Sequence, residues 1–312
     1  FKKVFCHLFV IATFFQISSS FGQDIYIKTF GDRSSTPIIY LHGGPGYNCS
    51  TFEMTTAQEL ANDGYYVVVY DRRGEGRSDE KSEYTLKQTH SDLVGIMDSL
   101  NIEAANLLGH SFGGMVAVTF AETHKDRVQS VILVGAPVSL QESFKTIINS
   151  CEKIYLESKD ETNLSYINML KEMDSASLQY SSYCFIHAMQ NGFYSPKNPT
   201  PEASRIYELF KSDSTLIANA SNMGYKQPQG FWKNDAYTTI NLTENIISLK
   251  KAGLKIYGAY GMEDGLYSKK QIDNLISILG DQNLLYLENC SHNVYIDRQS
   301  SFIEGLNNWL KN

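Results

Sequence analysis

Ser111 lies at the centre of the segment Gly109-His110-Ser111-Phe112-Gly113, a pattern typical of a nucleophilic serine. A short apolar run at residues 105–108 precedes this segment, and a helical pattern begins at Phe112. Glycines two positions on either side allow a tight strand-to-helix turn, which lifts the serine hydroxyl clear of the sheet. The pattern therefore predicts that Ser111 attacks an electrophilic carbon.

Such a serine needs a general base, and His292 is the best-placed histidine. It follows the last strand-like run, at residues 283–287, and the carboxyl ends of parallel strands meet at one edge of a sheet. We expect His42 to belong to a glycine-rich turn and His110 to pack inside the serine turn. Of the other histidines, we expect His90 on an outer helix and His124 at the end of the helix that follows Ser111. For His187, in the middle segment, we expect a surface position, with contact to substrate as the alternative.

The base in turn needs an acid that holds its tautomer and stabilises its charged form. Asp264 lies in the turn after the strand-like run at residues 254–260, which gives the chain order Ser, Asp, His. Its neighbour Glu263 is the alternative. The predicted catalytic set is therefore Ser111, Asp264 and His292.

A second glycine-rich turn, His42-Gly43-Gly44-Pro45-Gly46, follows the apolar run at residues 37–41. A tetrahedral oxyanion requires fixed N–H donors, and glycines allow the backbone to approach the oxygen closely. We predict an oxyanion hole made by the amides of Phe112 and Gly44, with Gly43 as the alternative to Gly44.

The elements that position these residues alternate between strand-like and helix-like patterns. Strands are expected at residues 24–30, 37–41, 65–70, 105–108, 128–134, 254–260 and 283–287, and helices at 51–62, 86–100, 112–124 and around 302–310. This alternation predicts an α/β fold with a doubly wound, mostly parallel sheet. It stops between residues 137 and 241, where we expect a mainly helical cap, because so long a stretch cannot be a simple loop. The core is thus divided into residues 23–136 and 242–312.

The first 22 residues resemble a secretory signal, with Lys2 and Lys3 before an apolar stretch and a small-residue ending. A buried first helix or a membrane anchor is the alternative, although the apolar run is short for a span. We therefore expect a secreted or periplasmic protein without stable membrane insertion. The 34 acidic against 27 basic residues, a formal charge of −7, argue against nucleic acid as a partner.

Cysteines do not decide the redox state of the chain. In an exported protein, the four cysteines that follow the leader, at positions 49, 151, 184 and 290, could form disulfides. The first candidate is a disulfide between Cys151 and Cys184. Free buried thiols are the alternative. No cysteine pair has the spacing of a zinc site, and neither a metal nor an organic cofactor is expected.

These motifs together resemble the α/β-hydrolase superfamily, and within it the proline iminopeptidase-like serine hydrolases. The resemblance rests on the turn at residues 42–46, the turn Asp71-Arg72-Arg73-Gly74-Glu75-Gly76-Arg77-Ser78, the Ser111 turn, Asp264 and His292. For residues 71–78 we expect ion pairing and loop shaping rather than catalysis. Epoxide hydrolases and haloalkane dehalogenases of this fold carry an aspartate where this chain has Ser111, which disfavours them.

The resemblance implies removal of an N-terminal residue from small peptides, with hydrolysis of small esters or lactones as the alternative. Iminopeptidases hold the substrate amine with cap carboxylates, one of them in a Glu-Asn-His-Tyr-Phe stretch, where this chain has Gln190-Asn191-Gly192-Phe193-Tyr194. Glu142, Glu152 or Glu202 could substitute for the missing acid. An aromatic pocket would instead favour an ester. Phe193, Tyr194 and Trp232 are the predicted substrate-binding residues, and Phe231 is a further candidate for such a pocket.

Overall fold

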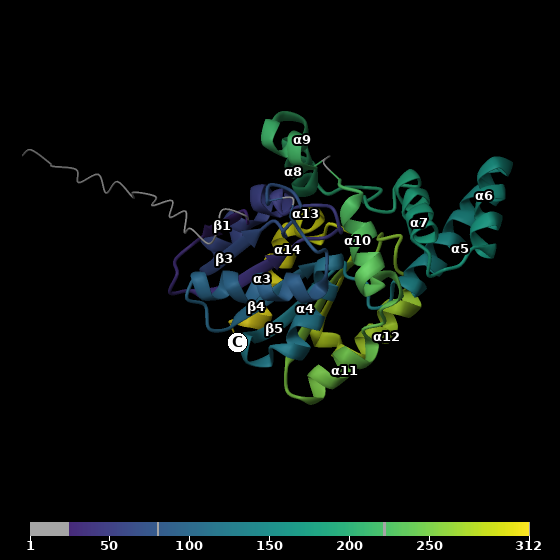
Figure 1. Cartoon of the computed structure of the whole chain (residues 1–312). Helices are drawn as coiled ribbons and strands as arrows, with labels where there is room; N and C mark the ends of the chain where they lie inside the picture. The colour runs from purple at the N-terminus through teal and green to yellow at the C-terminus, as the bar shows by residue number, and fades with distance from the viewer. Residues whose placement is uncertain (1–24, 80, 221–222, 312) are drawn as a thin grey trace, which may run out of the picture.

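The computed structural model of the chain describes residues 25–79, 81–220 and 223–311 (Figure 1). The leader predicted at residues 1–22 lies outside the described residues. Within them, seven strands form one sheet in the order β1-β3-β2-β4-β5-β6-β7. Only β1 is antiparallel to its neighbour, β3. The strands are β1 (Ile27–Phe30), β2 (Thr36–Leu41), β3 (Tyr65–Tyr70), β4 (Ala105–His110), β5 (Val128–Val134), β6 (Lys255–Gly261) and β7 (Leu284–Leu287).

Helices cover both faces of this sheet because its strands are apolar on both sides. Along β2, Ile38 packs with one buried cluster and Ile39 with the other, as the alternation of side chains along a strand requires. The face of Ile39 is covered by α3 (Leu86–Ser99), α4 (Phe112–Thr123), α11 (Thr243–Lys251) and α12 (Lys269–Leu279). The face of Ile38 is covered by α1 (Ser50–Phe52), η1 (Glu53–Ala57), α2 (Gln58–Asn62), α13 (Val294–Asp297) and α14 (Gln299–Leu310).

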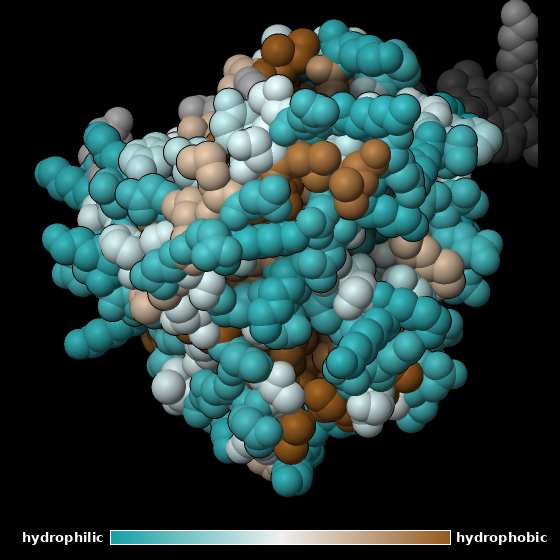
Figure 2. All heavy atoms as spheres, turned by 90° about the vertical axis from the view of Figure 1, so that its right-hand side faces the viewer, coloured by the Kyte–Doolittle hydropathy of each residue, from teal (hydrophilic) through white to brown (hydrophobic). Residues whose placement is uncertain are grey.

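Between β5 and β6 the chain leaves the sheet and forms further helices. We call six of them, α5 to α10, the cap helices. In Figure 1, α5, α6 and α7 project beyond the sheet at the right, while α8 and α9 stand at the top. Apolar side chains are scattered among polar ones on the side of the molecule that Figure 2 shows. The cap helices are α5 (Leu140–Ser158), α6 (Glu161–Glu172), α7 (Leu178–Gln190), α8 (Pro201–Ser212), α9 (Ser214–Ala220) and α10 (Lys226–Asp235).

The fold class predicted from the sequence is confirmed: the sheet is mostly parallel, is covered on both faces and alternates with helices. The expected strand at residues 24–30 is shorter in the structure, where β1 begins at Ile27. Short 3-10 turns complete the chain: η2 (Lys125–Arg127), η3 (Tyr237–Thr239) and η4 (Asp281–Asn283).

Candidate active site

Ser111 stands in a strained turn between β4 and α4. Its φ is 52° and its ψ is −123°, a backbone conformation that residues with side chains rarely adopt. Gly109 belongs to this turn, and a Cβ there would lie 2.5 Å from the carbonyl oxygen of Gly113. The glycine spacing is therefore a steric requirement of the turn that presents the Ser111 hydroxyl.

Asp264 and His292 meet at the same edge of the sheet, after β6 and β7. The Nδ1 atom of His292 lies 2.8 Å from the Oδ2 atom of Asp264, and both side chains are almost fully buried. The other oxygen of Asp264 accepts a hydrogen bond from the amide of Leu266 at 3.1 Å. Since a carboxylate accepts hydrogen bonds, Nδ1 of His292 carries the proton, which leaves Nε2 free to act as a base.

Glu263, the alternative acid, faces a different partner. Its Oε2 atom accepts a hydrogen bond from the amide of Lys197 at 2.5 Å. The structure therefore pairs His292 with Asp264 and directs the neighbouring carboxylate toward the cap.

His110, adjacent to Ser111, supports the position of His292. Its Nε2 atom donates to the carbonyl oxygen of His292 at 3.2 Å, and the two rings lie 4.9 Å apart. Burial and the neighbouring His292 lower the pKa of His110 well below its usual value. His110 is therefore a neutral packing residue of the turn, which is the role expected for it.

The turn at residues 42–46 lies against Ser111. A Cβ added to Gly43 would stand 3.1 Å from the Cβ of Ser111, and Gly44 has a φ of 109°. Phe112 is the first residue of α4, where the amides of a helix N-terminus lack intrahelical partners. These positions are compatible with the predicted oxyanion donors, Gly44 and Phe112.

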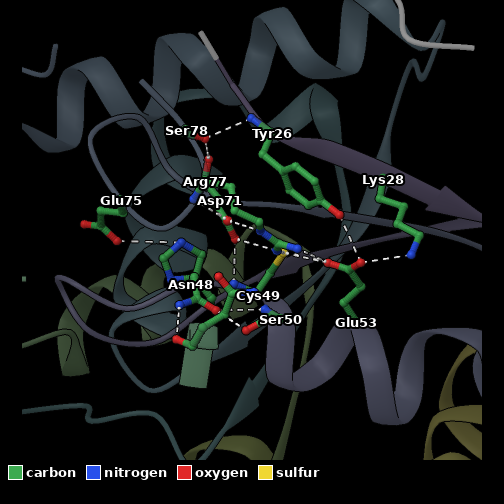
Figure 3. Close-up of polar contacts among 12 residues, drawn as sticks. Tyr26, Lys28, Asn48, Cys49, Ser50, Glu53, Asp71, Glu75, Arg77 and Ser78 are labelled. Carbon is green, nitrogen blue, oxygen red and sulfur yellow. Dashed lines mark hydrogen bonds and ion pairs between the residues drawn. The ribbon is translucent and has the colours of Figure 1, made fainter. Parts of the chain in front are cut away.

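The turn at residues 71–78 forms a dense polar network around the start of α1 (Figure 3). Asp71 accepts hydrogen bonds from the amide of Cys49 at 2.7 Å and from the amide of Arg77 at 2.9 Å. The Arg77 guanidinium also binds Glu53, at 2.8 Å. The turn thus has the ion-pairing and loop-shaping role that we expected.

Two neighbours of Asp71 in this turn, Arg72 and Glu75, form a buried pair with an N–O distance of 2.7 Å. Burial raises the pKa of Glu75 to about 7, although the charge of Arg72 acts to lower it. Sequence reasoning missed that Arg72 also binds the carbonyls of His42 and Gly43, because the motif alone does not show where its side chain points.

Aromatic residues of the segment between β5 and β6 contact the predicted catalytic set and its neighbour Phe112. The ring of Tyr194 packs edge-on against His292 at 5.0 Å, and the carbonyl oxygen of Phe193 accepts hydrogen bonds from the amide of Gly265 and the hydroxyl of Ser291. Phe231 reaches Phe112, with ring centroids 5.1 Å apart.

The structure also gives contacts for Trp232, a predicted substrate-binding residue, and for Tyr237. The indole N–H of Trp232 donates to the carbonyl of Ala176, and no contact found among the described residues joins it to the catalytic set. Tyr237, which no sequence pattern singled out, packs against Phe112 at 5.4 Å.

The acids considered for amine binding have partners elsewhere. Glu142 pairs with Lys145, Glu152 pairs with Lys171, and Glu202 binds Ser300. Gln190, at the position matched to a carboxylate, is exposed at the end of α7.

The cysteines and the remaining histidines have structural positions. Cys49, Cys151, Cys184 and Cys290 are free and buried, so the candidate pairing of Cys151 with Cys184 is wrong and the alternative, free buried thiols, is confirmed. All four thiols pack in the buried clusters as small hydrophobic side chains, a role that a count of cysteines cannot distinguish from pairing. Contrary to the expected surface position, His187 is buried and lies 2.9 Å from the hydroxyl of Tyr155. His90 binds Thr119 on α4, and His124 stacks on Phe120.

A family model described as the alpha/beta hydrolase fold matches residues 36–299. The chain belongs to the α/β-hydrolase family. Among the residues placed in the structure, no group of three or more His, Cys, Asp or Glu side chains could hold a metal ion.

The relatives of this α/β hydrolase include proline iminopeptidases. It is 35% identical to the proline iminopeptidase of Lactobacillus helveticus over 119 residues, 36% of this chain and 40% of that protein. The proline iminopeptidase of Lactobacillus crispatus is 24% identical over 298 residues, 93% of this chain and 95% of that one. The stronger identity therefore spans less than half the length of the relative.

Solved structures confirm the fold. The proline iminopeptidase-related protein of Thermus thermophilus superposes with a TM-score of 0.64 at 22% identity, covering 93% of this chain and 94% of that chain. An esterase of Exiguobacterium antarcticum gives a TM-score of 0.60 at 18% identity, covering 93% and 98%.

Proposed function

We propose that this α/β hydrolase is a serine hydrolase that works through an acyl-enzyme. One observation carries the proposal: Nδ1 of His292 is held 2.8 Å from Asp264 at the sheet edge where the strained turn presents Ser111. A hydroxyl, a neutral imidazole with one nitrogen free and a carboxylate on the other nitrogen are the parts needed for acyl transfer.

In this mechanism the Ser111 oxygen bonds to a substrate carbonyl carbon while its proton passes to Nε2 of His292. Asp264 stabilises the imidazolium, and the amides of Phe112 and Gly44 hold the negative oxygen. The tetrahedral intermediate then expels the leaving group, which takes the proton from His292. A water oxygen then bonds to the acyl carbon while one of its protons passes to the same nitrogen of His292. The bond between the acyl carbon and the Ser111 oxygen breaks, Ser111 takes that proton back, and the acid product leaves.

The first substrate class that we propose is a small peptide with a free N-terminus, from which one residue is removed in the manner of proline iminopeptidases. The support is the similarity to such an enzyme over 93% of the chain, together with the turns at residues 42–46 and 71–78.

A second class, small carboxylic esters or lactones, is favoured by a different observation. The cap-side neighbours of the catalytic set are aromatic, with Tyr194 against His292 and both Phe231 and Tyr237 against Phe112. Gln190 is neutral and exposed, so it offers no charge-assisted bond to an ammonium group. Phe193 and Trp232 remain proposed members of the substrate pocket.

A side-by-side assay of a prolyl anilide and a short-chain aryl ester tests both the serine mechanism and the substrate class. Ser111→Ala should abolish turnover, leaving only the residual rate of roughly 10³- to 10⁴-fold over water that binding and the oxyanion hole provide. The circular dichroism spectrum and melting temperature should match the unaltered chain. Turnover by Ser111→Ala close to the unaltered rate would refute the serine mechanism, and the preferred substrate would decide between peptidase and esterase.

We also propose export to the periplasm or the exterior, with the predicted leader removed. No helix in the described part of the chain is long and apolar enough to cross a membrane. Determining the N-terminal residue of the protein recovered outside the cytoplasm tests this, and a start at Gln23 is expected. Retention of the protein inside the cell with its leader intact would contradict it.

A further inference from the structure

The side chain of Arg72 reaches two carbonyl groups of the turn that lies against Ser111. Its guanidinium donates to the carbonyl of His42 at 2.5 Å and to the carbonyl of Gly43 at 2.6 Å. The side chain is only 3% exposed, so water does not compete for these bonds. One rigid, planar group therefore fixes two successive peptide units of the turn.

Fixing these carbonyls also fixes the amides of the turn. In a trans peptide the N–H points opposite to the C=O of the same unit, and the carbonyl of Gly43 shares its unit with the N–H of Gly44. With Gly43 bound to the guanidinium, the N–H of Gly44 points away from Arg72. In the same way, the bond to His42 orients the N–H of Gly43. Nδ1 of His42 also donates to the Gly43 carbonyl, at 2.9 Å, so Arg72 shares the Gly43 carbonyl with His42 and reaches the His42 carbonyl as well.

The same guanidinium contacts the residue that carries the other donor. The Arg72 guanidinium carbon lies 5.1 Å from the centre of the Phe112 ring, within the range of a cation–π contact. Arg72 thus contacts both parts of the proposed oxyanion hole, the turn that follows β2 and the first residue of α4.

Two further contacts hold Arg72 itself. Glu75 accepts from its guanidinium at 2.7 Å, and the backbone amide of Arg72 donates to Nε2 of His42 at 3.1 Å. Glu75 is itself only 2% exposed, so the pair that it forms with Arg72 lies out of solvent. The turn, the guanidinium and the carboxylate therefore form one preorganised unit.

We propose that Arg72 is a positioning residue for the oxyanion hole, which aims the Gly44 amide by holding the Gly43 carbonyl. This inference rests on the proposed serine mechanism. It predicts that a change at Arg72 slows attack at the serine without weakening the initial binding of substrate, because preorganised donors act on the transition state.

The experiment measures the rate at which a fluorophosphonate probe labels Ser111, which needs no knowledge of the natural substrate. The Ser111 oxygen displaces fluoride from phosphorus, and the phosphoryl oxygen takes the place of the carbonyl oxygen. Arg72→Gln should lower the second-order rate by about 100-fold, as expected for loss of one oxyanion donor. Arg72→Lys should recover only part of the rate, since a lysine ammonium cannot bind two carbonyls and a carboxylate in one plane.

Arg73→Gln is the matched control. Arg73 lies in the same turn and binds Asp92 at 2.8 Å, away from the turn at residues 42–46. This variant should lose a comparable ion pair and keep its labelling rate within about twofold. On whichever substrate the chain cleaves, the Arg72 variants should lower kcat and leave KM within about threefold.

Unchanged labelling in folded Arg72→Gln or Arg72→Lys would overturn the inference, as would an equal loss in Arg73→Gln. A rise in KM with an unchanged kcat would also contradict the inference. If Arg72→Gln does not fold, Arg72→Lys alone decides. Failure of the serine mechanism is distinguishable, because the probe would then label Ser111→Ala as fast as the unaltered chain.

Discussion

At the scale of single residues, Asp264 and His292 lie 28 positions apart in the chain and meet through one hydrogen bond. Their pairing could be predicted because each residue lies just after an apolar strand pattern, and the carboxyl ends of parallel strands converge. The arginine that holds the turn at residues 42–46 could not be recognised in this way. Arg72, Arg73 and Arg77 share one charged turn, and only the fold shows which of them binds the turn at residues 42–46.

The pairing of His292 with Asp264 gives a prediction that separates two neighbouring acids. Asp264→Asn removes the charge and allows the amide to favour the wrong tautomer of His292, so kcat should fall by about 10⁴-fold. Glu263→Gln should keep kcat within about threefold, because Glu263 binds the amide of Lys197 instead. Steady-state kinetics of both variants is the measurement, and equal losses would contradict the assignment of Asp264.

At the scale of elements, the strand, turn and helix around Ser111 were predictable because sterics leave little freedom there. Gly113 has the carbonyl oxygens of Leu41 and His42 directly where its Cβ would be. The helix α4 therefore starts in contact with the end of β2, and any side chain at this position would separate them. Sequence patterns are sufficient to predict local structure where only one residue type fits the available space.

Gly113→Ala is accordingly expected to destabilise the fold by more than about 4 kcal/mol, which is an exceptional loss for one methyl group. Gly64→Ala is the control, since nothing lies within 4 Å of a Cβ there and only its positive φ of 91° adds strain. That strain should cost roughly 1–2 kcal/mol. Chemical denaturation of both variants compares the two, and a Gly113→Ala variant as stable as Gly64→Ala would show that β2 and α4 can separate freely.

At the scale of the whole molecule, the core and the cap differ in how far the sequence predicts them. Runs such as Tyr65–Tyr70 are buried on both faces and bear the pattern of a parallel strand. The cap helices bury narrower faces and leave large apolar residues exposed, among them Leu156, Met169 and Met189. Their helical character could be predicted, but the contacts of Tyr237 and Trp232 depend on how these helices pack, which no local pattern encodes.

The cap is attached to the catalytic core through a buried carboxylate. Asp297 in α13 accepts hydrogen bonds from the hydroxyl of Tyr207 in α8, at 2.6 Å, and from the amide of Ser291, beside His292, at 2.7 Å. Burial raises the pKa of Asp297 to about 6. Because this pKa is above the usual value of about 3.9, ionisation of Asp297 costs stability as the pH rises from about 4 through 6.

Tyr207→Phe should increase this pH dependence. The hydroxyl donates to the ionised carboxylate, a bond of about 1.5–3 kcal/mol, and to the protonated form more weakly, at about 0.5–1.5 kcal/mol. The variant should therefore lose more free energy of unfolding at pH 8 than at pH 5, because its Asp297 has a still higher pKa. Denaturation at both pH values measures this, with Tyr183→Phe on the exposed face of α7 as the control. A loss that is equal at the two pH values would mean that Tyr207 acts by packing alone, and that the cap is not coupled to the charge of Asp297 behind His292.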